Sequence, residues 1–139
     1  KAEERGARAG ALDGLPAALP ALTRALKLQR RAARVGFDWP ETAQVIDKVV
    51  EEARELAEER DGDPDRIEDE YGDLLFVLVN LGRHLQIDPE KALRRTNAKF
   101  ERRFRAVEAA LAADGRRPED ATLTEMDALW DAAKARERG

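Results

Sequence analysis

The chain has 139 residues, a formal net charge of −4 at pH 7, and Asp, Glu, Lys or Arg at 39% of its positions. This length favours one domain with a modest core over separate catalytic and regulatory domains. Cysteine is absent, which excludes disulfides, thiolate metal sites and a cysteine nucleophile. Its absence is typical of a reducing compartment, so we expect a cytoplasmic protein.

Charge and hydropathy exclude further classes. No segment is long and apolar enough to span a membrane, and the N-terminus lacks a signal-peptide pattern, so we expect a soluble protein with no membrane partner. Lys and Arg are dispersed among acids, so no basic face indicates nucleic-acid binding. A single histidine argues against a zinc site, and no glycine-rich phosphate loop is present.

The first predicted elements are an arm and a helix. Residues 1–15 are rich in Ala, Gly, Arg and Glu and resemble a linker, which leaves 16–139 as the domain. Apolar residues recur at helical spacing from about Pro20, and Gly36 is a suitable helix stop. The aromatic pair Phe37 and Trp39 follows in a short loop. Such a pair either fills a core or offers a stacking surface for a ring.

A second helix is predicted from Pro40, in its first turn, to about Arg60. Its expected apolar stripe is Ile46, Val49, Val50, Ala53, Leu56 and Ala57. Residues 61–64 then combine a glycine, an aspartate cap and a proline, which indicates a sharp break before a third helix.

The third helix should run to about Gln86. Its expected stripe is Ile67, Tyr71, Leu74, Leu78, Leu81 and Leu85. Residues 74–79 are apolar on nearly every side, which a helix tolerates only when a partner covers it. We therefore expect a homodimer with this helix near the interface.

Asp88 and Pro89 predict the start of a fourth helix that ends near Ala113. Its expected inner face is Leu93, Phe100, Phe104, Val107 and Leu111. Thr122 and Glu125 form a capping-box pattern for a last helix. No alternating pattern indicates a strand, so the predicted fold is all-α, a four-helix-bundle-like domain with an additional C-terminal helix.

Paired carboxylates flank the predicted break between the second and third helices. Glu52 and Glu55 are spaced i, i+3, as are Glu70 and Asp73, and Glu51 adjoins the first pair. This spacing places each pair on neighbouring turns of one helix surface, where one hard cation such as Mg²⁺ could use both carboxylates. By spacing alone a solvated acidic face is the commoner explanation. Here, however, one member of each pair borders an apolar stripe and turns partly inward, namely Glu52 and Glu70, while Glu55 and Asp73 point further out.

Cations on the fourth helix form the positive counterpart. Lys99 and Arg103 are i, i+4 neighbours and suit phosphate oxygens. The alternative is a solvated face paired with Glu101 and Glu108. His84, near the end of the third helix, is more typical of a structural residue than of a catalytic one.

Several segments together resemble the MazG family of nucleoside triphosphate pyrophosphohydrolases, within the all-α pyrophosphohydrolase superfamily. They are VGFDW at 35–39, KVVEE at 48–52 with Glu55, EYGDLLF at 70–76, VNLGRHL at 79–85 and KFERRF at 99–104. The similarity covers about 16–134 and is closest to the C-terminal, catalytically competent domain of a two-domain protein. It implies a usually dimeric all-α fold that hydrolyses nucleoside triphosphates to monophosphate and pyrophosphate with Mg²⁺, for which Mn²⁺ can substitute.

The resemblance also implies roles for individual residues. The metal ligands would be Glu52, Glu55, Glu70 and Asp73, with Glu51 as our candidate for orienting or deprotonating the attacking water. The residues around the nucleotide would be Lys48, Lys99, Arg103, Trp130 and Lys134. Two alternatives stay open, namely a related enzyme acting on phosphoribosyl-ATP or dUTP and a helical interaction module without activity.

Overall fold

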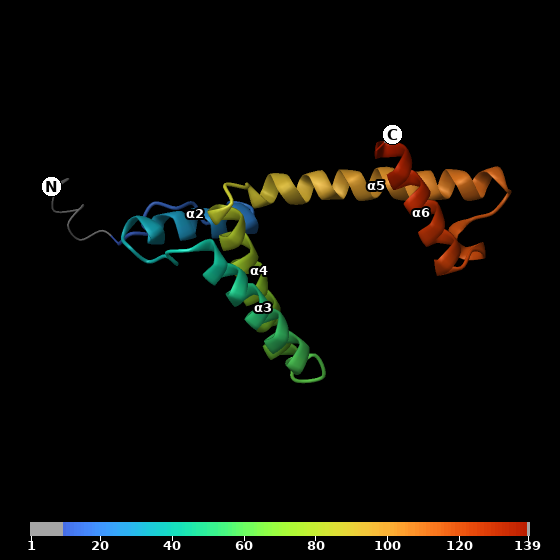
Figure 1. Ribbon diagram of the computed structural model, residues 1–139. Helices are drawn as coiled ribbons and strands as arrows, with labels where there is room; N and C mark the ends of the chain where they lie inside the picture. The colour runs from blue at the N-terminus through green and yellow to red at the C-terminus, as the bar shows by residue number, and fades with distance from the viewer. Residues whose placement is uncertain (1–9, 139) are drawn as a thin grey trace. The chain divides into compact units, whose positions relative to one another are not determined.

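A computed structural model describes residues 10–138 of the chain, and within that range the structure contains helices and no strand (Figure 1). The helices in order are α2 (Ala21–Arg34), α3 (Thr42–Glu59), α4 (Pro64–His84), α5 (Pro89–Ala113), the 3₁₀ helix η1 (Pro118–Asp120) and α6 (Leu123–Arg138). The prediction of an all-α fold with an additional C-terminal helix is confirmed. The predicted linker-like arm lies mostly outside the described residues.

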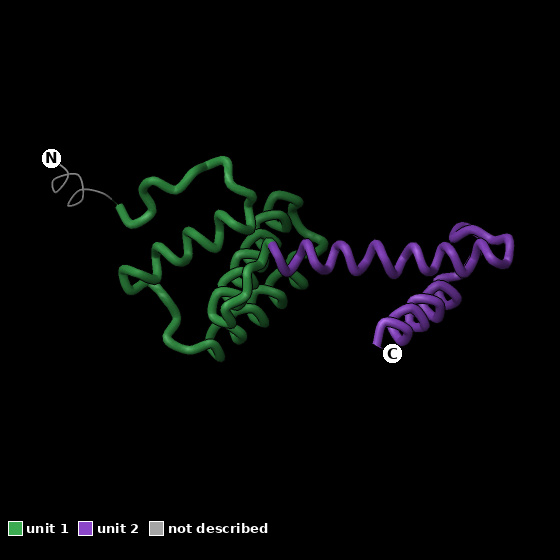
Figure 2. The backbone as a smooth tube through the Cα atoms, turned by 90° about the horizontal axis from the view of Figure 1, so that it is seen from above, with its two compact units in different colours: residues 1–90 green, residues 91–139 purple. Residues whose placement is uncertain are grey.

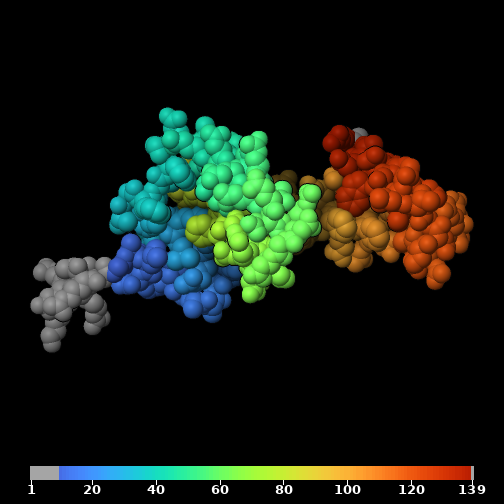
Figure 3. All heavy atoms as spheres, turned by 90° about the horizontal axis from the view of Figure 1, so that it is seen from below, coloured from blue at the N-terminus to red at the C-terminus, as the bar shows by residue number. Residues whose placement is uncertain are grey.

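The chain forms two compact units (Figure 2). The first extends to Glu90 and contains α2, α3 and α4, and the second begins at Lys91 and contains most of α5 together with η1 and α6. In the space-filling view the side chains of α3 and α4 form one continuous surface in the first unit, and those of α5 and α6 are in contact in the second (Figure 3).

The stop signal at Gly36 acts as predicted. Gly36 has a φ of 93°, a left-handed conformation that glycine adopts without steric cost. The N–H groups of Gly36 and Phe37 donate to the carbonyls of Ala33 and Ala32, at 3.0 Å each, so α2 ends in a Schellman motif.

The start of α3 differs from the prediction. Pro40 does not occupy the first turn, because Glu41 is the N-cap and the helix begins at Thr42. The Glu41 side chain accepts from the backbone of Gln44, and the Gln44 side chain accepts from the Glu41 N–H at 3.2 Å. This reciprocal pair satisfies two backbone donors at the start of the helix.

The break between α3 and α4 is the one that the sequence predicts. Asp63 accepts a hydrogen bond from the Asp65 N–H at 3.2 Å, and Pro64 occupies the first turn of α4. The two helices therefore form a hairpin and lie side by side (Figure 1). The helix α4 also packs against α2, where the Gln29 amide donates to the Phe76 carbonyl at 2.8 Å.

The buried line of the hairpin is rotated from both predicted stripes. In α3 it follows Val45, Val49, Glu52 and Leu56, of which Val45 and Glu52 are buried. In α4 the half-buried line follows Ile67, Glu70, Leu74, Val77 and Leu81. The alternating steps of three and four are typical of a narrow two-helix seam. The predicted members that remain exposed are Ile46, Val50, Ala53, Ala57, Tyr71, Leu78 and Leu85.

The helix α4 ends at His84, two residues before the predicted end. Gln86 has a φ of 61°, and the Ile87 N–H donates to the Gly82 carbonyl at 2.8 Å. This is again a Schellman motif, here with a residue other than glycine in the left-handed position. The sequence gives no glycine signal there, which explains the displaced prediction.

In the second unit, only part of the predicted inner face of α5 is buried. Val107 and Leu111 are buried, as is Ala133 of α6, whereas Leu93 and Phe100 are 48% and 57% exposed. The predicted capping box is present, since the Glu125 N–H donates to Thr122 Oγ1 at 3.1 Å and the Thr122 N–H donates to Glu125 Oε1 at 3.3 Å. Glu125 also accepts from Arg116 Nη1 at 2.6 Å.

Among the described residues, no helix is long and apolar enough to cross a membrane.

The Arg116–Glu125 pair generates a prediction about acid stability. The Arg116 hydrogen bond, with that of the Thr122 backbone, lowers the pKa of Glu125 from 4.5 to about 2. Because the folded pKa is depressed, the pair stabilises the fold above pH 4.5 and loses this effect as the pH falls toward 2. Glu125→Gln should therefore lower the urea midpoint at neutral pH, with a difference from wild type that narrows below pH 4.5.

Glu119→Gln is the matched control, because the Glu119 carboxylate lies 3.7 Å from Arg117 Nη1 in an exposed pair. It should leave the midpoint nearly unchanged at every pH. A Glu125→Gln difference that stays constant from neutral pH to pH 3 would contradict the assigned role of the pair.

Candidate functional site

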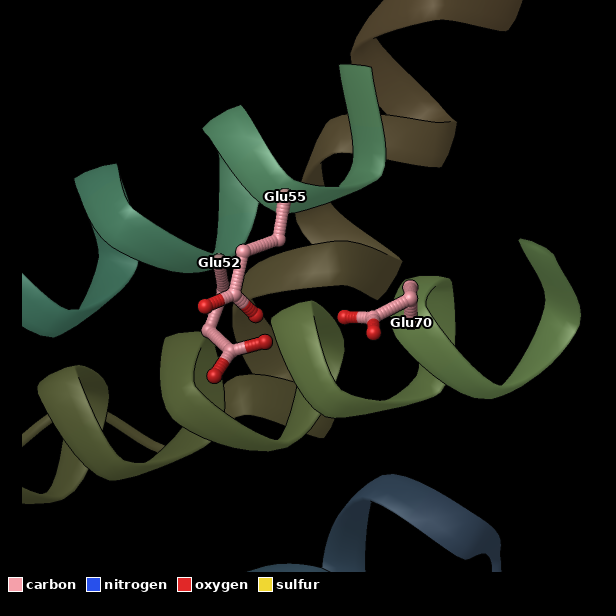
Figure 4. Close-up of side chains that lie close together, drawn as sticks. All are labelled: Glu52, Glu55 and Glu70. Carbon is pink, nitrogen blue, oxygen red and sulfur yellow. The ribbon is translucent and has the colours of Figure 1, made fainter. Parts of the chain in front are cut away.

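Three carboxylates meet between the two helices of the hairpin (Figure 4). Glu52 and Glu55 extend from α3 and Glu70 extends from α4, so that their side chains gather in the space between the ribbons. One oxygen of each lies within 4.8 Å of one oxygen of each of the others. The predicted convergence of acids across the break is thus present for these three.

Two of the three acids occupy positions of the apolar seam. Glu52 follows Val45 and Val49 in α3 and is only 6% exposed, and Glu70 is half-buried between Ile67 and Leu74 of α4. Glu52 Oε2 and Glu70 Oε2 are buried and have no hydrogen-bond partner among the described residues. An unpartnered buried carboxylate oxygen costs free energy unless a cation or another donor satisfies it.

Lys48 is the cation nearest to this cluster. Its Nζ lies 3.0 Å from Glu52 Oε1 and 3.4 Å from Glu51 Oε1. The hydrogen bond to Glu52 is the main cause of a raised pKa of Lys48, so this ammonium group stays charged. A single lysine offsets part of the negative charge and leaves the second oxygen of Glu52 available.

Repulsion between the acids raises the pKa of Glu55. The negative charge of Glu52 is the largest cause of a raised pKa of Glu55, followed by partial desolvation and by the charge of Glu70. Like charges so close destabilise one another unless a cation joins them. Three carboxylates with two unpartnered oxygens therefore fit a hard divalent cation that prefers oxygen ligands, such as Mg²⁺.

Asp73 and Glu51 lie outside this group of three. Asp73, one turn beyond Glu70 in α4, is exposed, and its pKa is raised by partial desolvation and by the charges of Asp69 and Glu52. Glu51 is exposed and lies beside Lys48. The structure thus gathers three of the four predicted metal ligands in one cluster.

The predicted nucleotide-binding residues other than Lys48 belong to the second unit. Arg103 of α5 has its guanidinium carbon 5.8 Å from the centre of the Trp130 ring of α6, within cation–π range. The Phe100 ring lies 5.3 Å from Trp130 and stacks on Phe104 at 6.0 Å. Lys99 and Lys134 are half-buried on the same two helices.

Sequence reasoning missed Glu137, the carboxylate that contacts this group. Glu137 accepts hydrogen bonds from Arg102 Nε at 2.9 Å and from Arg103 Nε at 3.0 Å. These bonds lower its pKa from 4.5 to about 2. Glu137 is seven residues after Trp130 and therefore lies two turns further along the same face of α6. This spacing could have indicated that Glu137 contacts the arginines near Trp130.

A second missed residue is Asp38, in the loop between α2 and α3. It accepts hydrogen bonds from Arg83 and from His84, whose Nε2 lies 2.9 Å away. The Arg83 hydrogen bond is the main cause of the lowered pKa of Asp38. These contacts agree with a structural role for His84. Phe37 and Trp39, by contrast, are 81% and 44% exposed, so they do not fill the core.

Fold and site together define an all-α protein whose helical hairpin presents a carboxylate cluster with the donor set for a divalent cation. Residues 41–107 match the model of the MazG nucleotide pyrophosphohydrolase domain. The chain belongs to the MazG family.

Relatives with named functions agree with this assignment. The chain is 47% identical over 142 residues to the nucleoside triphosphate pyrophosphohydrolase of Escherichia coli K12, covering 99% of the chain and 54% of the relative. It is 41% identical over 138 residues to the nucleoside triphosphate pyrophosphohydrolase/pyrophosphatase MazG of Thermotoga maritima, covering 96% and 52%. The uncharacterized protein YabN of Bacillus subtilis is 44% identical over 140 residues, covering 99% and 29%. The chain thus spans about half the length of the two named enzymes.

The cluster predicts a linked change in stability and metal binding. Glu55→Gln removes one of three repelling charges, so the melting temperature in a chelator should rise above that of wild type. In wild type, Mg²⁺ at 100 times its dissociation constant should add about 2.7 kcal/mol, and the same concentration should add distinctly less to the variant. Thermal unfolding with chelator and with Mg²⁺ measures both effects.

Glu58→Gln is the control, because Glu58 lies on α3 outside the group of three and is exposed. Its Mg²⁺-induced shift should equal that of wild type. An unchanged shift in Glu55→Gln would remove Glu55 from the metal site.

Proposed function

We propose that the chain hydrolyses nucleoside triphosphates to nucleoside monophosphate and pyrophosphate in a divalent-metal-dependent reaction. The observation that carries the proposal is the cluster of Glu52, Glu55 and Glu70 with two unpartnered buried oxygens. The names of the two relatives that share 47% and 41% identity with the chain support the same activity. Control or cleansing of the nucleotide pool is the corresponding role.

The proposed metal ligands are the three clustered glutamates and Asp73, which lies one turn from Glu70. When bound, Mg²⁺, or Mn²⁺ in its place, would neutralise polyphosphate charge and polarise the phosphorus that is attacked. The carboxylates would hold that cation at the hairpin, and Lys48 fixes the orientation of Glu52 by its 3.0 Å contact. Without Lys48, Glu52 would lose its only described partner and its fixed geometry.

The bond changes follow from cleavage between the α and β phosphates. The oxygen of a water molecule forms a bond to the α phosphorus while the bond from that phosphorus to the bridging oxygen breaks. The bridging oxygen leaves with pyrophosphate. Glu51, exposed beside Lys48, is the proposed acceptor of the proton that the water loses.

The proposed nucleotide contacts use the chemistry of the second unit. Lys99, Arg103 and Lys134 supply positive charge for phosphate oxygens, and Trp130 offers a ring for stacking. A stacking surface accepts every base, so these residues predict broad base acceptance. Phosphoribosyl-ATP and dUTP belong in the substrate panel for this reason.

We also propose a homodimer with α4 near the interface. Tyr71, Leu75, Phe76 and Leu78 of this helix are between 39% and 54% exposed in the single chain. Large apolar side chains clustered on one helix favour a protein partner over water. We propose that a second copy of the chain covers this face, because the resemblance is to a family of usually dimeric enzymes.

The reaction predicts its products and the position of an isotope label. A nucleoside triphosphate should yield monophosphate and pyrophosphate in equal amounts with Mg²⁺ or Mn²⁺, and little product with Ca²⁺, whose looser coordination orients water less strictly. In ¹⁸O-labelled water the label should appear in the monophosphate. Mass spectrometry of both products measures the label.

Other outcomes would exclude this mechanism or this class. Label only in pyrophosphate would indicate attack at the β phosphorus, and free phosphate with diphosphate would indicate a phosphatase. A protein that binds no divalent cation and releases no pyrophosphate from any substrate in the panel would be a helical interaction module.

The dimer predicts a change of mass upon a single substitution. Leu75→Glu places a charge on the exposed face of α4 and should convert the dimer to monomer at micromolar concentration, as measured by sedimentation. Leu12→Glu is the matched control, since Leu12 is 48% exposed outside the described helices and should leave the mass unchanged. A wild-type chain that sediments as a monomer refutes the dimer.

A further inference from the structure

Glu137 contacts two neighbouring arginines through different oxygens. Its Oε1 accepts from Arg102 Nε at 2.9 Å, and its Oε2 lies 3.0 Å from Arg103 Nε and 2.9 Å from Arg103 Nη2. One carboxylate of α6 thus joins two consecutive residues of α5. The Arg103 side chain is only 15% exposed, whereas that of Arg102 is 59% exposed.

The contacts leave a defined edge of Arg103 available. A guanidinium group has five N–H donors, one on Nε and two on each terminal nitrogen. Glu137 lies against the Nε and Nη2 edge. Both donors of Nη1 and one of Nη2 have no partner among the described residues. One donor of Nη1 and the remaining donor of Nη2 form the outer edge of the guanidinium group, and these two can make parallel hydrogen bonds to one phosphate group.

Trp130 limits the same side chain on a second side. The guanidinium carbon lies 5.8 Å from the Trp130 ring centre, and Phe100 packs against that ring at 5.3 Å. Glu137 therefore restrains one edge of Arg103, and the Trp130 ring restricts the space on another side of it. An arginine held in this way loses less conformational freedom when an anion binds than a mobile one does.

The exposed pair of Glu101 and Arg105 on α5 provides a contrast. The two side chains are 2.6 Å apart, but they are 63% and 72% exposed and belong to adjacent turns of one helix. Pairs of this kind contribute little to stability and fix no other group. Glu137 differs, because it connects two helices and approaches an arginine that is largely buried.

We propose that Glu137 is a positioning residue that holds Arg103 so that its outer edge binds the polyphosphate of the substrate. This inference rests on the proposed function for the identity of the substrate. The lowered pKa keeps Glu137 ionised throughout the neutral range, so the contact persists under working conditions. Glu137 touches arginine rather than substrate, and it therefore acts on substrate affinity through Arg103.

Binding can be measured without turnover by titrating inorganic tripolyphosphate against Trp130 fluorescence. Trp39→Phe removes the other of the two tryptophans, so the signal reports Trp130 alone. In this background Glu137→Gln should weaken tripolyphosphate binding about tenfold, which corresponds to the cost of ordering one long side chain. KM for a nucleoside triphosphate should rise by a similar factor while kcat changes less.

Two further variants separate positioning from general stability. Glu125→Gln removes another Arg-paired carboxylate of α6, and it should change neither tripolyphosphate affinity nor KM. Arg103→Lys replaces the planar group that Glu137 holds, so adding Glu137→Gln to Arg103→Lys should cause no additional loss of affinity. This non-additivity is the result that a merely stabilising role would not produce.

Each alternative outcome overturns the proposal. Tighter binding by Glu137→Gln would show that the carboxylate competes with phosphate, and equal affinity or fully additive losses would show that it acts independently of Arg103. No Trp130 response in the Trp39→Phe protein would remove Arg103 from phosphate binding even if pyrophosphate is released. Conversely, normal tripolyphosphate binding without hydrolysis of any triphosphate would refute the proposed function and leave the role of Glu137 intact.

Discussion

The repulsion among carboxylates inside the α3–α4 seam is the constraint on which the site depends. A two-helix seam gains stability by burying apolar side chains, yet two of its positions hold Glu52 and Glu70. Each leaves one buried oxygen without a hydrogen bond. The hairpin stays folded despite the free-energy cost of these two buried oxygens, because the apolar residues on either side, including Val45, keep the helices together. A cation that joins the carboxylates would convert the cost into stabilisation.

The balance of positive and negative side chains differs between the two units. Near the seam, Lys48 offsets part of the negative charge of Glu51 and Glu52, and the carboxylate cluster keeps a net negative charge. In the second unit positive charge is in excess at this contact, since Glu137 is the one acid among the described residues that forms ion pairs with Arg102 and Arg103. A polyphosphate anion has charge complementary to the arginines of the second unit.

Exposure of the predicted stripes has a physical explanation in the packing of α4. A helix with apolar residues on nearly every side has more than one face to bury. One face meets α3 and another meets α2, where Gln29 bonds to the Phe76 carbonyl. Tyr71 and Leu78 belong to neither face and remain exposed. Periodicity identified the helix correctly, but it could not say which of several apolar faces would meet which neighbour.

The sequence by itself determined the helices, the break at Asp63 and Pro64, the stop at Gly36 and the capping box at Thr122, because these signals act through hydrogen bonds between residues close in the chain. It also placed the acids on facing helices. Only the tertiary structure decided that Glu52 is buried in the seam, that Glu55 rather than Asp73 completes the cluster, and that Glu137 joins Arg102 to Arg103. Those outcomes depend on the rotation of one helix against another, which local periodicity leaves free by about one residue.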